Sequence, residues 1–200
     1  MDLNIISITY LFLRLAPFVL VCFFSLSSLL NQDFKGLVYL AGLIVACFIT
    51  ILFGNILKLS NYLPEERPEI CNLLTINQQG DFSKLPLSQT VFSFTLFYLL
   101  VPIKEQHLAK QNIPTLVFFP ILILFDIAWN IQNTCYKFQH LLASLILGGG
   151  IGLGWGYLIY KTNPSIQYLV GPKNNEVCSK PTKQYFKCKT SNGNTINGIQ

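Results

Sequence analysis

The chain has 200 residues, of which 52% are hydrophobic and only 12% are charged, and its formal net charge is +5. Its mean hydropathy is +0.47. About a quarter of the residues of a soluble globular domain carry charge, so this composition excludes an ordinary soluble domain. The apolar residues also fall in long runs, as they do in helices that are solvated by lipid.

These runs predict an all-α bundle of about five transmembrane helices, at residues 5–30, 37–57, 88–103, 113–131 and 141–160. A helix needs about 20 residues to cross a hydrocarbon core about 30 Å thick. The third run is shorter than this, so it can span only if flanking residues extend the helix or the bilayer is locally thin. The first run is too long for a cleaved signal peptide and contains Arg14, so we expect a retained helix. The prediction is a transmembrane domain at residues 1–160 and a soluble basic tail at residues 161–200.

The lysines predict an orientation for this bundle. Five spans place the two termini on opposite faces, and the face that holds the tail is the richer in lysine. Its lysines are Lys35, Lys104, Lys110, Lys161, Lys173, Lys180, Lys183, Lys187 and Lys189. The positive-inside rule then predicts that the tail is cytoplasmic, and that the connections at residues 55–87 and 132–139 lie outside or in a lumen.

Three polar segments fall on that predicted outer face. The first holds Lys58 and Arg67-Pro68, the second is residues 85–89, and the third runs from Tyr136 through His140 to a glycine-rich helix that begins at Gly148. In order and spacing they resemble the motifs of the type 2 phosphatidic acid phosphatase family, which includes lipid phosphatases, dolichyl-diphosphatases and vanadium haloperoxidases. The resemblance covers roughly residues 37–160. It implies that His140 is the catalytic nucleophile and that Lys58, Arg67 and Gln89 bind phosphate.

Several positions depart from the family pattern. Gln89 stands where the family has a catalytic histidine, Ser144 where it has an aspartate, and Thr134 where it has an arginine, while Ser60 occupies the usual lysine position. A glutamine cannot act as a general acid, and a serine supplies no charge to stabilise an attacking imidazole. A threonine cannot make the bidentate contacts by which an arginine binds phosphoryl oxygens. The departures predict a bundle with little or no turnover.

Each of these residues also has a simpler interpretation. His140 is then an interfacial histidine at a helix start, and Lys58 and Arg67 are surface charges. The glycines of residues 148–156 then serve close helix packing. Asp126 lies within an apolar span, where an ionisable group is rare and faces a partner or a cavity.

The six cysteines form no CxxC pair, so no metal site and no cofactor are predicted. Cys71 and Cys135 fall on the same predicted face, but the sequence does not determine the distance between them. In the tail, residues 184–190 followed by residues 191–194 indicate a strand entering a turn, as in a small hairpin. The expected partners are the lipid bilayer and, through the tail lysines, anionic head groups or a protein assembly, with no nucleic acid.

Two functional classes follow. The first is a structural or membrane-anchoring protein without turnover, and in composition such a chain resembles the inner-membrane proteins of large DNA virus particles. The second is a lipid or isoprenoid phosphate phosphatase with an altered site, in which His140 still attacks phosphorus. A weaker third option is head-group binding by Lys58 and Arg67 without hydrolysis.

Overall fold

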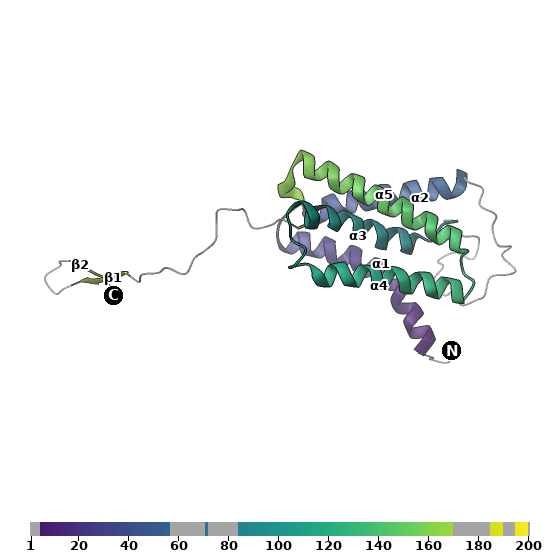
Figure 1. Cartoon of the computed structure of the whole chain (residues 1–200), viewed down its shortest axis with the longest axis horizontal. Helices are drawn as coiled ribbons and strands as arrows, with labels where there is room; N and C mark the ends of the chain where they lie inside the picture. Colours follow the sequence, from purple (N-terminus) through teal and green to yellow (C-terminus); the bar gives the residue numbers. More distant parts are fainter. Residues whose placement is uncertain (1–4, 57–70, 72–83, 170–184, 190–194, 200) are drawn as a thin grey trace. The chain divides into compact units, whose positions relative to one another are not determined.

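The computed structural model describes residues 5–56, 71, 84–169, 185–189 and 195–199. Within them the chain forms two compact units, Met1–Val170 and Gly171–Gln200, which are described separately. The first unit holds helices α1 (Ile5–Leu30), α2 (Lys35–Ile56), α3 (Leu87–Glu105), α4 (Ile113–Gln132) and α5 (Phe138–Thr162), followed by the short 3-10 helix η3 (Pro164–Ile166) (Figure 1). The second holds strands β1 (Tyr185–Lys189) and β2 (Thr195–Ile199).

The predicted bundle of five membrane-spanning helices is confirmed, since all five are long and apolar enough to cross a membrane. The helix ends differ from the prediction by up to three residues, and two of these differences matter. Helix α3 extends to 19 residues because Leu87, Lys104 and Glu105 are also helical, which removes the need for a thin bilayer. Helix α5 begins at Phe138, so His140 lies inside its first turn and not before it.

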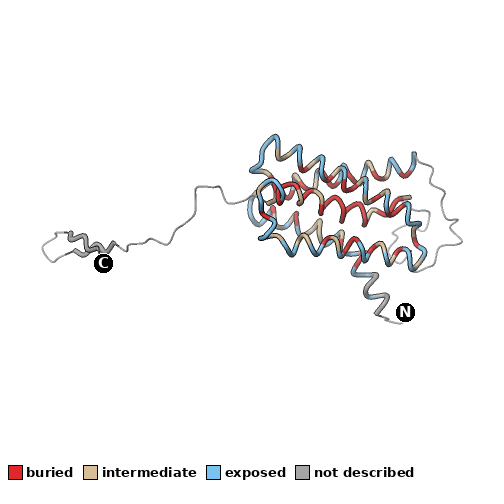
Figure 2. The backbone as a smooth tube through the Cα atoms, viewed as in Figure 1, coloured by how far each residue is buried: buried red, intermediate tan, exposed pale blue. Residues whose placement is uncertain are grey.

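Helix α3 is the central helix of the bundle. It contacts α1, α2, α4 and α5, and side chains around nearly its whole circumference are buried (Figure 2). This position explains its polar sequence, because the hydroxyls and amides of Ser88, Gln89, Thr90, Ser93 and Thr95 are shielded from lipid by the surrounding helices. The weakest apolar run in the sequence is therefore the most enclosed helix in the fold.

Glycines on one side of α5 permit close contact with α3. A Cβ atom added to Gly152 would lie 2.6 Å from the carbonyl oxygen of Phe94, and one added to Gly148 would lie 2.6 Å from that of Thr90. Gly156 faces Tyr98 in the same way, with a Cβ–carbonyl oxygen distance of 3.2 Å. Successive glycines thus meet successive turns of α3, which makes α3 and α5 parallel neighbours. The interpretation of the glycines of residues 148–156 as packing residues is confirmed for Gly148, Gly152 and Gly156, whereas an added Cβ at Gly150 or Gly154 meets nothing within 4 Å.

Helix α2 runs antiparallel to this pair and is joined to it by polar contacts. The hydroxyls of Tyr39 and Thr95 lie 2.7 Å apart, and the indole N–H of Trp155 donates to the carbonyl of Val38 at 3.1 Å. Around Tyr39 the rings of Phe24, Phe94 and Tyr98 pack with centroid distances of 4.1–5.7 Å. Offset and edge-on ring contacts of this kind stabilise a core beyond the area that they bury.

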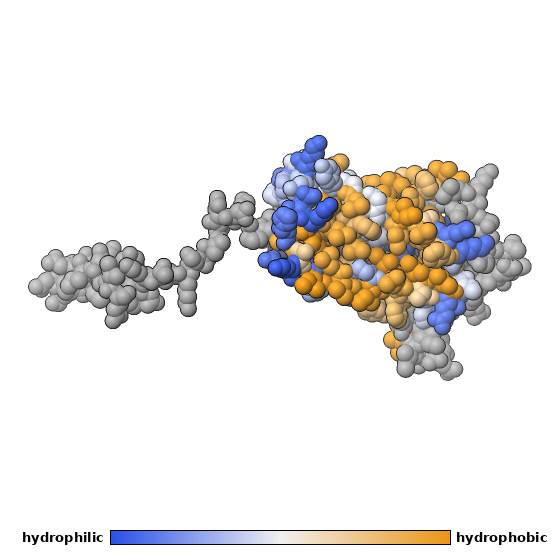
Figure 3. Space-filling view, viewed as in Figure 1, coloured by the Kyte–Doolittle hydropathy of each residue, from blue (hydrophilic) through white to orange (hydrophobic). Residues whose placement is uncertain are grey.

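The outer faces of the surrounding helices are apolar. Large side chains such as Phe18, Phe48, Ile121 and Ile146 are exposed, and Figure 3 shows that hydrophobic residues cover the middle of the visible face of the bundle, with hydrophilic residues toward its two ends. An exposed apolar surface this wide on a soluble monomer would be unusual. In a bilayer it is the surface that the lipid tails contact, so the fold defines a multi-pass helical membrane protein.

The first unit extends beyond the predicted domain boundary at residue 160. It ends at Val170, because the residues after α5 fold back onto the bundle. Gln167 is fully buried there, and its amide N–H donates to the carbonyl of Gly156 at 3.1 Å. The boundary between domain and tail therefore lies ten residues later than the sequence predicts.

The second unit contains the antiparallel hairpin that the sequence predicts. Strands β1 and β2 pair from Tyr185 opposite Ile199 to Lys189 opposite Thr195. Two strands alone are marginally stable in water.

The α3–α5 contact predicts opposite effects for two neighbouring glycines. Gly152→Ala places a methyl group against the backbone of Phe94 and should lower the free energy of unfolding by about 1–3 kcal/mol. Gly154→Ala is the matched control, because no atom lies within 4 Å of its added Cβ and alanine favours helix. Unfolding in mixed micelles measures both, and equal effects of the two substitutions would contradict the proposed contact.

Candidate functional site

One end of the bundle gathers the polar residues, and we call it the disulfide end. It is formed by the last turns of α2 and α4 and the first turns of α3 and α5. Gly54 near the end of α2 lies against Leu85, just before α3, with a distance of 3.3 Å from its added Cβ to the leucine Cγ. The opposite end, with the last turns of α1, α3 and α5, is called the tail end.

A disulfide joins the two connections at the disulfide end. Cys71, between α2 and α3, is bonded to Cys135, between α4 and α5, with a Cα–Cα distance of 5.7 Å. Both residues are buried. The bond answers a question that the sequence left open, and it shows that the two connections lie together, as their predicted shared face requires.

The α4–α5 connection is tightly folded next to this bond. The N–H of Cys135 donates to the carbonyl of Asn130 at 3.0 Å, and Thr134 has a left-handed φ of 52°. This is a Schellman-type helix end, at which glycine is the usual left-handed residue. A β-branched threonine is strained in that conformation. Thr134 therefore serves as a helix terminator at the end of α4.

His140 is held in the first turn of α5. It is buried, and its backbone N–H donates to the carbonyl of Lys137 at 2.9 Å. Ser144 follows one turn later and is fully buried, with no hydrogen-bond partner for its hydroxyl among the described residues. Gly148 follows one further turn along, against Thr90 of α3.

Gln89 lies in the first turn of α3 and is fully buried. Neither its amide nitrogen nor its amide oxygen has a hydrogen-bond partner among the described residues. Ser88 faces α4 and Ser93 faces Gly148 of α5, and a step of about 100° per residue places Gln89 between those two directions. A buried amide without partners costs about 1–3 kcal/mol, which makes this position a feature to explain.

The structure brings Gln89 and His140 to the same end of the bundle but not to the same depth. Gly148 faces Thr90 and Gly152 faces Phe94, so a residue of α5 is level with the residue 58 positions earlier in α3 (148 − 90 and 152 − 94). By this register Gln89 is level with residue 147, and His140 lies seven residues nearer the end, or roughly 10 Å at the rise of a helix. The prediction of one shared face holds, and the two residues lie at different depths along the bundle.

Asp126 of α4 lies near the level of Gln89. Its carboxylate is buried and accepts a hydrogen bond from the Ser88 hydroxyl at 3.4 Å, and Asn130, one turn later, donates its side-chain amide to the Asp126 carbonyl at 2.7 Å. An ionisable group inside a span is expensive and commonly functional. The sequence indicated Asp126 but not Asn130, although their spacing of four residues on one helix is a usable signal.

A set of buried polar side chains thus occupies the half of the bundle nearest the disulfide. We call it the buried polar layer, and it comprises Thr50, Ser88, Gln89, Thr90, Ser93, Asp126, Asn130, His140 and Ser144. Lys58 and Arg67, predicted to bind phosphate, lie outside the described residues, as does the side chain of Arg14. Among the described residues no group of three or more histidine, cysteine or acidic side chains is placed to hold a metal ion.

Comparison with known protein families, curated proteins and solved structures returned no match. The class of the protein therefore rests on the fold, and that class is a multi-pass helical membrane protein.

The disulfide should stabilise the bundle strongly. Its cysteines are 64 residues apart, and in the chain-entropy description a loop of that length contributes about 4 kcal/mol. The double variant Cys71→Ala with Cys135→Ala should therefore unfold at a clearly lower temperature in micelles. The control is Cys22→Ala with Cys47→Ala, because both cysteines are free in the structure. A reductant should lower the melting temperature of the wild type but not of the first variant, and equal sensitivity would contradict the assignment.

Proposed function

We propose that this chain is a structural or membrane-anchoring protein with a phosphatase-like helical bundle and no turnover. The observation that carries the proposal is the chemistry of two fully buried positions. Gln89 and Ser144 occupy the positions that the family resemblance assigns to a general acid and an orienting carboxylate, and neither supplies a proton or a charge. Buried uncharged groups suit internal packing better than phosphoryl transfer.

The separation in depth supports the same proposal. In-line displacement at phosphorus needs the attacking and protonating groups on opposite sides of one phosphoryl group, within hydrogen-bond reach of it. The helix register instead places Gln89 roughly 10 Å deeper than His140. Even if position 89 were a histidine, its backbone would lie at a different depth in the bundle from that of His140.

The setting that we propose is the inner membrane of a large DNA virus particle, which the composition favours. In such a membrane a small bundle anchors the chain in the bilayer, and its basic tail binds a partner at the membrane surface. The tail supplies the charge for this connection, because residues 171–200 hold five lysines and one glutamate. Its partners are anionic lipid head groups or a protein assembly.

We further propose that the disulfide end faces outside or a lumen and that the tail is cytoplasmic. Two independent features support this orientation. Disulfides form and persist in oxidising compartments, and Cys71–Cys135 lies at one end only. The turns at the opposite end hold Lys35, Lys104, Lys110 and Lys161, in agreement with the positive-inside rule.

A lipid or isoprenoid phosphate phosphatase is the alternative. One observation favours it: Asp126 places a carboxylate in the buried polar layer, although Ser144 supplies none. In that case His140 attacks phosphorus, and the Asp126 carboxyl group, near the level of Gln89, is the acidic side chain of the site.

The two functions differ in phosphate release. Purified protein in micelles, given phosphatidate or a prenyl diphosphate, should release no more phosphate than matched micelles without protein. The decisive variant is His140→Ala, with Ser144→Ala as its structural control in the same helix. Release by the wild type that His140→Ala abolishes, while the fold is retained, establishes the phosphatase and overturns the structural proposal.

The orientation is tested by protease access. Trypsin added to intact cells should leave the lysine-rich residues 171–200 uncut, and it should remove them once the plasma membrane is permeabilised. A membrane-impermeant reductant should reach Cys71–Cys135 when it is added to intact cells, or to sealed vesicles whose outer surface is the face that carries the disulfide end. Removal of the tail before permeabilisation would show that the bundle is inserted the other way round.

A further inference from the structure

We propose that the tail hairpin docks onto the anionic lipid head groups of the leaflet at the tail end of its own bundle. The inference names the partner of the structural function proposed above and rests on it. It is carried by three observations: the tail leaves the bundle from a fixed point, the tail and that end of the bundle carry charge of the same sign, and strand β1 of the hairpin carries two lysines at alternate positions.

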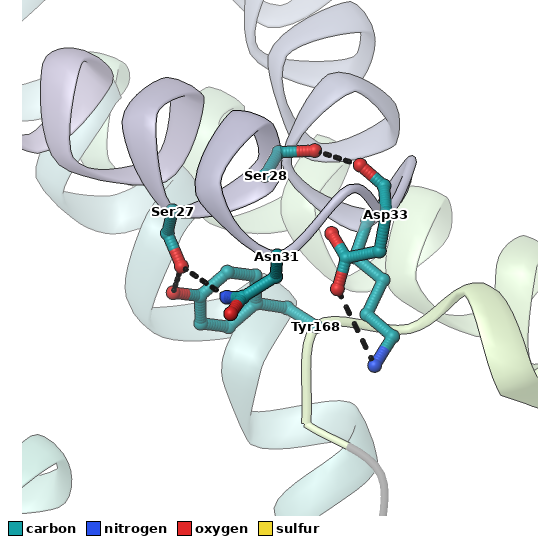
Figure 4. A network of polar contacts seen from close by, with 6 residues as sticks. Ser27, Ser28, Asn31, Asp33 and Tyr168 are labelled. Atoms are coloured by element: carbon teal, nitrogen blue, oxygen red, sulfur yellow. Dashed lines mark hydrogen bonds and ion pairs between the residues drawn. The ribbon is translucent and has the colours of Figure 1, made fainter.

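The root of the tail is fixed by side-chain contacts (Figure 4). The hydroxyl of Tyr168 donates to that of Ser27 at 3.1 Å, and its ring packs edge-on against Phe24 with a centroid distance of 4.5 Å. Tyr168 therefore holds the tail root against the last turns of α1. A tyrosine with an apolar ring and a bonded hydroxyl is typical of the boundary between lipid tails and head groups.

Gln167 holds the same segment to α3 and α5. Its amide N–H donates to Gly156, and its amide oxygen accepts from the side chain of Gln106, just after α3, at 3.4 Å. The Gln106 amide also lies 3.4 Å from the carbonyl of Leu169. The chain is thus bonded to three helices just before the tail begins, so the tail starts beside the membrane surface.

The tail end of the bundle and the tail itself are both basic. The described turns at that end carry Lys35, Lys104, Lys110 and Lys161 against Asp33 and Glu105, and Lys35 pairs with Asp33 at 3.7 Å. The tail unit has five lysines and one glutamate in residues 171–200. Each of these basic segments attracts an anionic leaflet.

The hairpin is suited to a flat charged surface. Lys187 and Lys189 are two positions apart on β1 and so fall on the same side of the strand, opposite Asn197 and Thr195 of β2. The Tyr185–Ile199 pair shares this register, so the four polar positions occupy the end of the ladder away from that pair. A two-stranded hairpin is marginal alone, and a surface that binds only its folded form stabilises it.

The tether allows this contact. Fourteen residues separate Val170 from Tyr185, and an extended chain of that length spans up to about 50 Å. A tether of this length keeps the hairpin at a high effective concentration above the leaflet. Each lysine near an anionic surface contributes roughly a fivefold factor in binding, so several together give a firm but salt-sensitive attachment.

Hydrogen exchange on the full chain tests the proposal. The protein is placed in nanodiscs of phosphatidylcholine alone or of phosphatidylcholine with phosphatidylserine, and exchange at residues 185–189 and 195–199 is followed by mass spectrometry. We expect exchange about tenfold slower on the anionic discs. At an ionic strength of about 1 M, where the Debye length is roughly 3 Å, the difference should disappear.

Charge-matched variants separate the tail from the bundle. Lys187→Gln with Lys189→Gln should reduce the slowing of exchange on the anionic discs by a factor of at least about five. Lys104→Gln with Lys110→Gln removes the same charge from the turns of the bundle and should leave the slowing unchanged. Equal exchange on both kinds of disc overturns the proposal, and so does slowing that appears only when an acidic protein is added. Phosphate release bears on the structural function alone, so failure of that function and failure of the docking are told apart.

Discussion

The close contact between α3 and α5 is the interaction on which the rest of the structure depends. In a bilayer the hydrophobic effect gives helices little reason to associate, because lipid tails are as apolar as the side chains they would replace. Gly148, Gly152 and Gly156 remove the side chains that would hold the two backbones apart. Dispersion contacts between the backbones then supply the association, and α3 becomes a helix that other helices can enclose.

Enclosure of α3 has a direct chemical consequence. Its hydroxyl and amide side chains no longer face lipid, so a span with Ser88, Gln89, Thr90, Ser93 and Thr95 is tolerated. The hydroxyls find partners on neighbouring helices or on their own backbone, as Thr95 does with Tyr39. The same arrangement leaves the Gln89 amide without a partner among the described residues. The buried polar layer is thus a product of the packing and does not by itself indicate catalysis.

Most of the fold could be predicted from the sequence, because length and hydropathy alone limit what a bilayer accepts. The five spans and the tail hairpin appear where the apolar runs and the strand pattern place them. The start of α5 at Phe138 and the burial of Gln167 could not be predicted, since both depend on contacts with other helices. A polar residue that is buried only by tertiary packing has the same local sequence as one in a solvated turn.

The sequence predicts on which face of the membrane the candidate site residues lie, but not how deep each of them lies in the bundle. An odd number of spans between residues 89 and 140 would have separated Gln89 from His140, and one helix pair, α3 and α4, returns the chain to the same face. Their offset of roughly 10 Å is set by the register of the glycines against α3, which no local pattern encodes. Likewise the sequence places Cys71 and Cys135 on one face, but only the fold brings their Cα atoms to 5.7 Å.

The two ends of the bundle are built in different ways, and the difference bears on function. At the disulfide end a covalent bond joins two connections above a buried polar layer. At the tail end the corresponding joint is made of hydrogen bonds from Gln106, Gln167 and Tyr168. A disulfide is a covalent joint that persists in an oxidising compartment, whereas hydrogen bonds hold a chain in position without a redox requirement. Joints at both ends of the bundle, together with uncharged groups at Gln89 and Ser144, are the features that the structural role proposed above requires.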